Sequence, residues 1–410
     1  MIKTFLLSLY EEAVRVSKPK HCLPKYFASF DKNQRVCILG AGKAAADMAV
    51  EAYNYFGDNA YGLVVTRYGY ENTESTGNID VRLAAHPVPD ENSVEGAKAL
   101  LSLASKVAPS ENAIFLISGG GSSLACALPE GISLDEKLAL HKFLLRSGAS
   151  IEEMNTVRKH VSVIKGGRLA AVSRGINTSL VISDVVGDDP AFIASGLTVQ
   201  DTTRPEDAIA ILDRYGFSEA SSIRDHLNQA LPLPKVSGDY TLVANAQSAI
   251  DAAVKKAKAA GWDTEIISYT ERGEAQTVAK RHAEIALEYK KKGKPILLFS
   301  GGELTVTLGD SEGEGGPNQE YLMALANALE GEPGISALAA DTDGVDGSKD
   351  VAGAFIDEGT LAKAFNKGLD VNVLLNEHNS FGFFDALDAH IEIGPTRTNV
   401  NDFRVISIST

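Results

Sequence analysis

The sequence predicts two α/β domains, the first a doubly wound, mostly parallel sheet. Short β-rich runs alternate with helix-period segments through nearly all 410 residues. Most of these runs are continuously apolar, which is typical of strands that helices cover on both faces. Many of the 37 glycines cluster just after a strand-like run or just before a helical one. A chain of this length most simply forms two domains of about 100–200 residues each.

The first half begins with an amphipathic surface helix, since the apolar run near the amino terminus is closed by Glu11 and Glu12. That interruption also argues against a secretory signal. The strands expected next are residues 35–39, 62–66, 81–84, 113–118 and 179–183, and the helices between them are residues 43–56, 92–107, 133–148 and 151–173. Strands separated by helices of this length are the repeating unit of a parallel sheet.

Two prolines and a glycine in residues 231–238 mark a domain boundary. We therefore expect a Rossmann-like domain over residues 1–236 and a smaller α/β domain over residues 237–410. In the second, strands are expected at residues 241–244, 264–268, 296–300, 335–340, 371–375, 391–393 and 404–408, and helices at residues 247–260, 274–291 and 318–330.

Composition excludes several classes of protein. Acids outnumber bases by 54 to 39, and the net charge of −15 disfavours binding to nucleic acids or anionic membranes. No apolar run approaches the roughly 20 residues of a membrane-spanning helix. Cys22, Cys37 and Cys126 are an odd number without metal-ligand spacing, so we expect neither a disulfide framework nor a zinc site, and a cytoplasmic location.

The first candidate site is Gly40-Ala41-Gly42-Lys43, between a strand and a helix. Such a turn brings backbone N–H groups and a helix N-terminus to a phosphate. Lys43 opposes the helix dipole there, so it needs an anionic partner or solvent. A dinucleotide enzyme would also need an acid at the end of the next strand, which instead ends in Thr66-Arg67. Arg67 keeps an NADP interpretation open, and a tight turn with a solvated lysine is the simpler alternative.

The second candidate is Ser118-Gly119-Gly120-Gly121-Ser122-Ser123, in which successive N–H groups and hydroxyls can form an anion nest. An acyl-enzyme elbow around Ser122 would need glycine at position 124, where the chain has Leu124. The alternative is a glycine loop required only for packing of the strand against the helix.

Two further clusters carry charge. Arg158, Lys159, Lys165 and Arg168 place four cations within eleven residues, with Asn155 on the same helix face as Arg158. This pattern favours a local anion site over a solvated helix face. The stretch from Asp184 to Asp188 and Asp189 follows a strand, where carboxylates suit Mg²⁺, although they could instead serve as Asx turns.

Taken in order, these motifs resemble the glycerate 2-kinase family, whose carboxyl-terminal part is the MOFRL domain. The matching stretches are Gly40-Ala41-Gly42-Lys43-Ala44-Ala45, His86-Pro87-Val88-Pro89-Asp90, Ser118-Gly119-Gly120-Gly121-Ser122-Ser123-Leu124, Asn155-Thr156-Val157-Arg158-Lys159-His160, Lys165-Gly166-Gly167, Ser183-Asp184-Val185-Val186-Gly187-Asp188, Ser300-Gly301-Gly302-Glu303, Asp341-Thr342-Asp343-Gly344, and Gly394-Pro395-Thr396 with Thr398-Asn399-Val400.

The resemblance implies ATP-dependent phosphorylation of D-glycerate at its 2-hydroxyl, with Mg²⁺, in a cleft between two α/β domains. Its members are often named hydroxypyruvate reductases, so an NAD(P)H-dependent reductase is the alternative activity, and a non-enzymatic sensing module is a third. Glycerate and ATP are the expected partners, without nucleic acid or membrane, and a homodimer is left open.

We hypothesise roles for individual residues of the expected active site. The catalytic residues are Lys43, Arg158 and Asp184, and the Mg²⁺ ligands are Asp184 and Asp188. Nucleotide and phosphate are expected at Gly40, Gly42, Ser118, Gly119, Gly120, Gly121, Ser122, Ser123, Gly301, Gly302, Glu303 and Asn318, and substrate at Ser122, Arg158, Lys159 and Asn399. The chain departs from the family at Pro317, where many members have arginine. Another cation, such as Arg158 or Arg397, would then have to replace that arginine.

Overall fold

The computed structural model describes residues 2–409 and forms two compact units. The N-unit is Pro19–Val243, and the C-unit combines the described residues up to Lys18 with those from Ala244 onward. The chain therefore crosses between the units seven residues after the predicted boundary. A second difference from the prediction is that the amino-terminal helix α1 (Ile2–Ser17) belongs to the C-unit.

A six-stranded sheet forms the centre of the N-unit, in the order β3-β2-β1-β4-β5-β6. The pairs from β3 across to β5 are all parallel. This is the strand order of a doubly wound nucleotide-binding fold, whose ligand crevice lies where the order reverses, between β1 and β4. The predicted fold class is confirmed. The strands are β1 (Val36–Ala41), β2 (Ala60–Arg67), β3 (Asn78–Ala84), β4 (Asn112–Ile117), β5 (Ile176–Ile182) and β6 (Asp239–Ala244).

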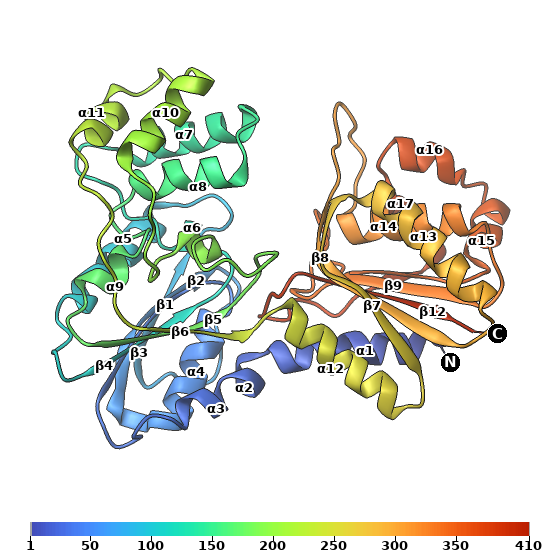
Figure 1. Ribbon diagram of the computed structural model, residues 1–410, viewed down its shortest axis with the longest axis horizontal. Helices are drawn as coiled ribbons and strands as arrows, with labels where there is room; N and C mark the ends of the chain where they lie inside the picture. Colours follow the sequence, from blue (N-terminus) through green and yellow to red (C-terminus); the bar gives the residue numbers. More distant parts are fainter. Residues whose placement is uncertain (1, 410) are drawn as a thin grey trace. The chain divides into compact units, whose positions relative to one another are not determined.

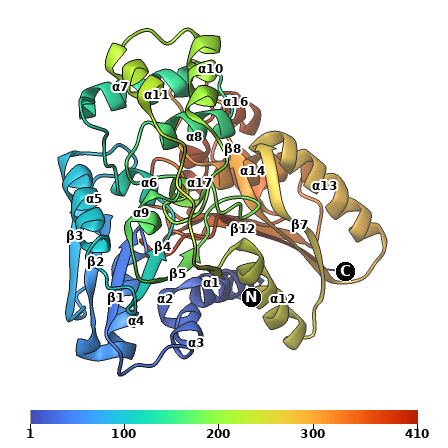
Figure 2. The same cartoon turned by 60° about the vertical axis from the view of Figure 1, so that its left-hand side comes forward.

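Helices bury both faces of this sheet. Cys37, Leu39 and Phe115 belong to one core with Leu100 of α5 (Glu91–Ala104), which lies along β2 and β3 (Figure 2). Because side chains alternate along a strand, the buried neighbour Ile38 faces the opposite way. The helix α4 (Ala45–Phe56) packs on β1 and β2. The continuously apolar strands of the sequence follow from this double cover.

Four helices of the N-unit form a separate small core, grouped in green in Figure 1. They are α7 (Leu134–Arg146), α8 (Ile151–His160), α10 (Pro205–Tyr215) and α11 (Ser221–Gln229). The single helix predicted over residues 151–173 is wrong. The first helix, α8, ends at His160 because the backbone of Val161 leaves the helical region. Gly166 and Gly167 then adopt left-handed backbone conformations before the second helix, α9 (Arg168–Val172). The remaining short N-unit helices are α2 (Pro19–Cys22), α3 (Pro24–Phe27) and α6 (Gly121–Leu124), with two 3₁₀ turns at Gly57–Asn59 and Ile193–Ser195.

The C-unit holds a second, mixed six-stranded sheet in the order β11-β10-β9-β12-β8-β7, with β7 and β8 parallel. Buried Leu6, Leu9 and Tyr10 of α1 lie on the same side of it as α12 (Ala246–Ala259), while α13 and α14 cover the other face (Figure 1). The strands are β7 (Asp263–Glu274), β8 (Ile296–Thr305), β9 (Ile335–Asp341), β10 (Gly353–Ile356), β11 (His390–Ile391) and β12 (Asp402–Ile408), and the other helices are α13 (Ala275–Lys291), α14 (Pro317–Leu329), α15 (Thr360–Asn366), α16 (Val371–Asn376) and α17 (Ser380–Leu387).

The strand predicted at residues 371–375 is wrong, because this segment is the helix α16. The Asp370 carboxylate caps the helix by accepting hydrogen bonds from the backbone N–H groups of Asn372 and Val373. This cap outweighs the β-propensity of the two valines. Among residues 2–409, no helix is long and apolar enough to cross a membrane. All three cysteines are buried free thiols.

Candidate active site

Two of the predicted glycine loops lie side by side at the point where the N-unit strand order reverses. The backbone N–H of Lys43 donates to the Gly119 carbonyl at 2.8 Å, and the N–H of Ala44 donates to Ser118 Oγ at 3.0 Å. At Gly42 the backbone has φ of 146°, and a Cβ there would lie 2.1 Å from Ser118 Oγ. Gly42 therefore allows the close approach of the two loops. Gly40, by contrast, lies inside β1, paired with Val64 and Leu116.

Three chemically active side chains surround the turn at Gly119 and Gly120. A Cβ on Gly119 would lie 1.9 Å from Asp184 Oδ2. A Cβ on Gly120 would lie 2.8 Å from the His86 ring and 3.3 Å from Lys43 Cγ. Lys43, Gly119 and Asp184, all predicted as site residues, are thus brought together. His86 joins them, and its sequence surroundings alone did not identify a role.

A cavity of about 250 Å³ adjoins this turn and contains cationic side chains but no acidic ones. Its lining residues are His86, Pro87, Pro89, Gly120, Ser122, Ser123, Cys126, Lys137, Leu138, His141, Arg158 and Lys165. The absence of aspartate and glutamate from the lining, in a protein of net charge −15, is the strongest electrostatic feature of the site. The lining suits a small anion.

Within the described residues, the hydrogen-bond partners of the three cations in this cavity are all neutral. Lys137 Nζ donates to the Val161 carbonyl at 2.8 Å, and Lys165 Nζ donates to Ser122 Oγ at 2.7 Å. Arg158 Nη2 bonds to His141 Nδ1 at 2.8 Å. The buried Nε of Arg158 has no partner in the described part of the chain. These charges are therefore uncompensated by carboxylates, and an anion would satisfy them.

Burial and mutual repulsion lower the pKa values of the basic groups in the cavity. Burial, followed by repulsion from Lys165 and Arg158, lowers the pKa of Lys137 to about 7. Burial and Arg158 lower the pKa of Lys165 to about 8. The pKa of His141 falls to about 4, again from burial first and then from Arg158, so His141 accepts the arginine's hydrogen bond as a neutral ring. A bound anion would raise all three values.

A chain of hydrogen bonds runs from the cavity into the protein. Ser122 Oγ lies 2.8 Å from Ser195 Oγ, which donates to Asn155 Oδ1 at 3.3 Å. Ser123 Oγ instead donates to the Gly120 carbonyl at 3.1 Å. The predicted pairing of Asn155 and Arg158 on one helix face is thus seen, with Arg158 lining the cavity and Asn155 behind Ser122.

Lys159, predicted to bind substrate, is 3% exposed and forms a buried ion pair with Asp201. It also lies 5.4 Å from the centre of the Phe192 ring. Lys159 is not among the residues that line the cavity. It shares a helix with Arg158 but faces a different environment, a distinction that spacing alone did not make.

The predicted magnesium ligands differ in their surroundings. Among residues 2–409, no group of three or more His, Cys, Asp or Glu side chains is arranged to hold a metal. Mg²⁺, however, commonly takes one or two carboxylates together with waters and substrate phosphates. Asp184 fits that pattern as a single carboxylate just after β5, where it packs directly against the Gly119 backbone. Asp188 follows the Gly187 turn with φ of 57°, and its charge helps to raise the pKa of Tyr240, which burial raises first.

The predicted site residues of the C-unit have local structural roles. Gly301, Gly302 and Glu303 were expected in a loop after a strand, but they lie within β8, so that expectation is wrong. The Asn318 amide donates to Asp346 Oδ1 at 3.2 Å and to Asp402 Oδ1 at 2.6 Å. The Asn399 side chain accepts from the backbone N–H of Asn401 at 2.9 Å. Pro317 occupies the first turn of α14, where its fixed φ suits helix initiation.

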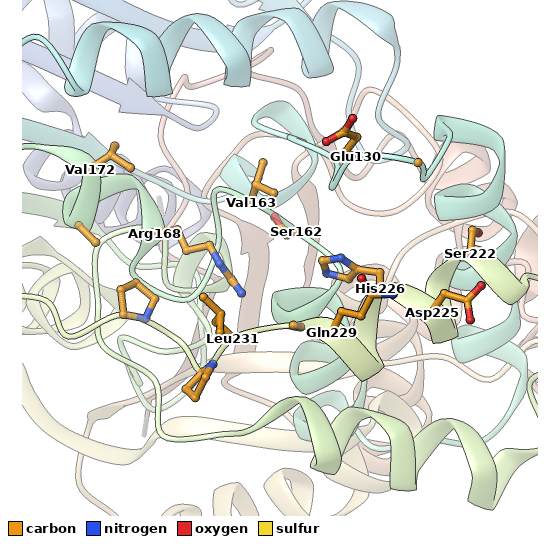
Figure 3. Close-up of a pocket in the computed structure, with 15 residues that line it drawn as sticks. Glu130, Ser162, Val163, Arg168, Val172, Ser222, Asp225, His226, Gln229 and Leu231 are labelled. Atoms are coloured by element: carbon orange, nitrogen blue, oxygen red, sulfur yellow. The ribbon is translucent and has the colours of Figure 1, made fainter.

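A larger pocket of about 910 Å³ is lined in part by Ser162, Val163 and Arg168, from the segment that carries Lys165. Figure 3 shows the side chains of Arg168 and His226 extending into it. Arg168 Nη1 also donates to the carbonyls of Lys159 and Lys165, at 2.9 Å and 3.1 Å. The lining of this pocket also includes two acids, Glu130 and Asp225, and Arg168 is the one member of the predicted cation cluster among its lining residues. Arg168 therefore braces the segment from behind.

Sequence reasoning missed Lys137 and His141 and gave Lys165 no individual role. Lys137 and His141 lie on α7, outside every motif, and no local pattern distinguishes them from solvated helix residues. Only the packing of α7 against α8 and the Ser122 turn makes them part of the cavity. Lys165 did belong to the cation cluster, so a signal for it was present.

Comparison with known proteins agrees with this geometry. Residues 5–228 match the model of a domain of unknown function, DUF4147, and residues 296–402 match the MOFRL family. The chain is 38% identical to a glycerate 2-kinase of Pyrococcus horikoshii, covering 97% of this chain and 92% of that protein. It is 37% identical to a D-glycerate 2-kinase of Thermotoga maritima, covering 98% of this chain and 97% of that protein.

A relative in Agrobacterium vitis, 42% identical over 98% of this chain and 94% of its own length, carries the provisional name hydroxypyruvate reductase. Among solved structures, a glycerate kinase from Thermotoga maritima superimposes with a TM-score of 0.93 at 36% identity, covering 100% of this chain and 99% of that one. The shared motifs, the two family models and the full-length match in structure place the chain in the glycerate 2-kinase family.

Proposed function

We propose that this protein is an ATP-dependent kinase that phosphorylates D-glycerate at its 2-hydroxyl to give 2-phosphoglycerate. The observation that carries the proposal is the acid-free cationic cavity beside Lys43 and Asp184, at the reversal point of the N-unit sheet. Its volume of about 250 Å³ suits a three-carbon acid. The names of the relatives in Pyrococcus and Thermotoga support the same activity.

Phosphoryl transfer asks the protein mainly to position two anionic reactants and to offset their charge. We propose that Lys43 offsets charge on the transferring phosphoryl group and that Arg158 holds the glycerate carboxylate. Lys137 and Lys165, which also line the cavity, would add positive charge around the same acid. Ser122 and the Gly119–Gly120 turn would contact phosphate or carboxylate oxygens.

Asp184 would hold Mg²⁺, and the ion would supply positive charge that offsets the charge of the phosphate groups. Asp188, four residues after Asp184, is the second proposed ligand. The Asp184 carboxylate packs against the Gly119 backbone, so the lack of a Cβ at residue 119 makes room for the proposed metal ligand as well as for the turn.

A direct test is to combine the purified protein with ATP, Mg²⁺ and D-glycerate and to follow ADP with a coupled assay. Phosphorus NMR of the product then separates 2-phosphoglycerate from 3-phosphoglycerate. Formation of the 2-phosphate is expected. Absence of ADP formation from folded protein, or a product phosphorylated at the 3-hydroxyl, would overturn the corresponding part of the proposal.

The competing function is an NAD(P)H-dependent reduction of hydroxypyruvate, favoured only by the provisional name of relatives. The strand β2 ends in Thr66-Arg67, without the acid that would bind the ribose of NAD. Arg67 lies 5.3 Å from the centre of the Tyr70 ring, which occupies one face of its guanidinium. Hydroxypyruvate-dependent loss of absorbance at 340 nm would support the reductase instead.

We also propose a cytoplasmic location, supported by the three buried free thiols, which suit a reducing compartment. A homodimer remains the simplest assembly to test, by light scattering of the purified protein.

A further inference from the structure

The Ser122 hydroxyl is held between a lysine and a second serine. Lys165 Nζ lies 2.7 Å from Ser122 Oγ on one side, and Ser195 Oγ lies 2.8 Å away on the other. Ser195 is oriented in turn by Asn155. Anion binding accounts for the Ser122 hydroxyl and for the charge of Lys165, but it does not account for Ser195 and Asn155 behind them.

This arrangement matches the general pattern of an activated nucleophile. A nucleophilic hydroxyl, a base within hydrogen-bond reach and a third group that orients them recur in unrelated enzymes, including pairs of serine and lysine. A lysine acts as a base when it is desolvated or lies beside another cation. Lys165 meets both conditions, since it is 4% exposed and shares the cavity with Arg158 and Lys137.

The groups that face Lys165 come from several elements. They are Ser122 of α6, Cys126 just after it, Lys137 of α7 and Arg158 of α8. With no carboxylate among the cavity-lining residues, the neutral amine is accessible near pH 8, where the pKa of Lys165 lies. Lys165 can therefore take up a proton from the hydroxyl that it contacts.

The second serine is held in an unusual backbone conformation. Ser195 and its neighbour Ala194 have φ of 57° and 50°, in the left-handed region that non-glycine residues seldom adopt. Such residues cost on the order of 1–3 kcal/mol and concentrate at functional sites. Here the strained turn aims the Ser195 hydroxyl at Ser122.

We propose that Ser122 is a nucleophile and that this cavity hydrolyses small carboxylic esters. Ser122 Oγ attacks the ester carbonyl and forms the Oγ–C bond, while its proton passes to Lys165 Nζ. The C–O bond to the leaving alcohol then breaks, and the alkoxide takes the proton from Lys165. Water attacks the acyl-enzyme in the same way and releases the acid and the Ser122 hydroxyl.

The rest of the cavity supports this chemistry. Arg158, which lines the same cavity, can stabilise the negative charge that develops on the carbonyl oxygen. The volume of about 250 Å³ restricts the acyl group to a few carbons. Ser123, which lines the same cavity, donates to the Gly120 carbonyl, whereas Ser122 accepts from Lys165. Ser122 is thus distinguished from its neighbour by its partners.

The test uses a fluorophosphonate probe and p-nitrophenyl acetate, without ATP or glycerate. The probe should label the full-length protein at Ser122, located by tandem mass spectrometry, with a rate that rises with pH through about 8. Ser122→Ala should lose both labelling and ester hydrolysis. Lys165→Met should lower both rates by about 10²-fold or more, as for loss of a general base. Ser179→Ala is the matched control, since that buried serine donates to Thr198 within the N-unit, and its labelling should stay unchanged.

Thermal melting establishes that each variant is folded. If Lys165→Met does not fold, Lys165→Arg, which keeps the positive charge but cannot act as a base, replaces it. Ser122→Cys should restore acylation and add alkylation by iodoacetamide at residue 122. Labelling at another residue, an unlabelled folded wild type, or hydrolysis that survives Ser122→Ala would overturn the inference. A protein that phosphorylates glycerate yet resists the probe would overturn this inference alone.

Discussion

Replacing Lys137 by methionine should stabilise the ligand-free protein while weakening its activity. Lys137 is buried, carries a proton at low pH and has only the Val161 carbonyl as partner. Its pKa is lowered from 10.5 to about 7, mainly by burial. Such a lowering corresponds to about 5 kcal/mol of unfavourable free energy for the charged form, at about 1.4 kcal/mol for each tenfold change.

Removing the charge of Lys137 relieves this unfavourable free energy, but the variant also loses a hydrogen bond. Methionine leaves the Val161 carbonyl without its hydrogen bond, which costs about 1–3 kcal/mol. We therefore expect a net stabilisation of about 2–4 kcal/mol near pH 7. At about 2–4 °C per kcal/mol for a unit of this size, the melting temperature should rise by roughly 5–15 °C.

The stability difference between Lys137→Met and wild type should depend on pH. The folded-state pKa of Lys137 lies below its unfolded value, so the penalty is full below pH 7 and disappears as the pH rises toward 10.5. The gap between Lys137→Met and wild type should therefore narrow from pH 7 to pH 10. Lys98→Met, at an exposed lysine paired with Glu95, serves as the control and should change little.

Differential scanning fluorimetry across this pH range measures the effect, and added glycerate or phosphate should stabilise wild type more than the variant. A variant that melts below wild type at pH 7, or a gap independent of pH, would refute the reasoning. Either outcome would mean that Lys137 is not an uncompensated buried charge.

Three further predictions concern the proposed kinase reaction. Lys43→Ala should lower kcat by about 10³-fold, as for loss of a cation at the transferring phosphoryl group, while its circular dichroism spectrum stays unchanged. A rate within tenfold of wild type would reject that role. Gly119→Ala should abolish most activity and weaken activation by Mg²⁺, because the added Cβ would lie 1.9 Å from the Asp184 carboxylate. Gly131→Ala is the control: no atom lies within 4 Å of a Cβ at residue 131, so this variant should lose only about 1 kcal/mol of stability. The KM for glycerate should rise between pH 7 and pH 9, because Lys137 and Lys165 lose their protons in that range. Steady-state kinetics that give the same KM at every pH would contradict contact between these lysines and the acid.

Pro317 shows how a departure from the family pattern can be accommodated locally. Proline at the start of α14 lacks the N–H that would be left without a partner and has the φ that a helix needs. It cannot replace the charge of an arginine. The structure places three cations in the N-unit cavity, and these are the groups available there to offset substrate charge.

The sequence by itself determined the class of fold and indicated several residues of the proposed phosphate-binding site. Continuously apolar runs near β1, β2 and β4 identified buried parallel strands, because such strands need no polar face. The glycines at 42 and 119 indicated backbone approaching closely to something else, and the carboxylate of Asp184 indicated a ligand at a strand end. Each of these signals is local, and each could be read within a few residues.

Only the tertiary structure decided which charges face the cavity. Arg158 and Lys159 are adjacent in sequence, yet one lines the cavity and the other pairs with Asp201, because a helix turns by about 100° per residue. Lys137 and Lys165 come from separate segments and meet beside Ser122 only after α7, α8 and the glycine turn have packed. Desolvation and mutual repulsion, which set the chemistry of these groups, arise from that packing and have no counterpart in the unfolded chain.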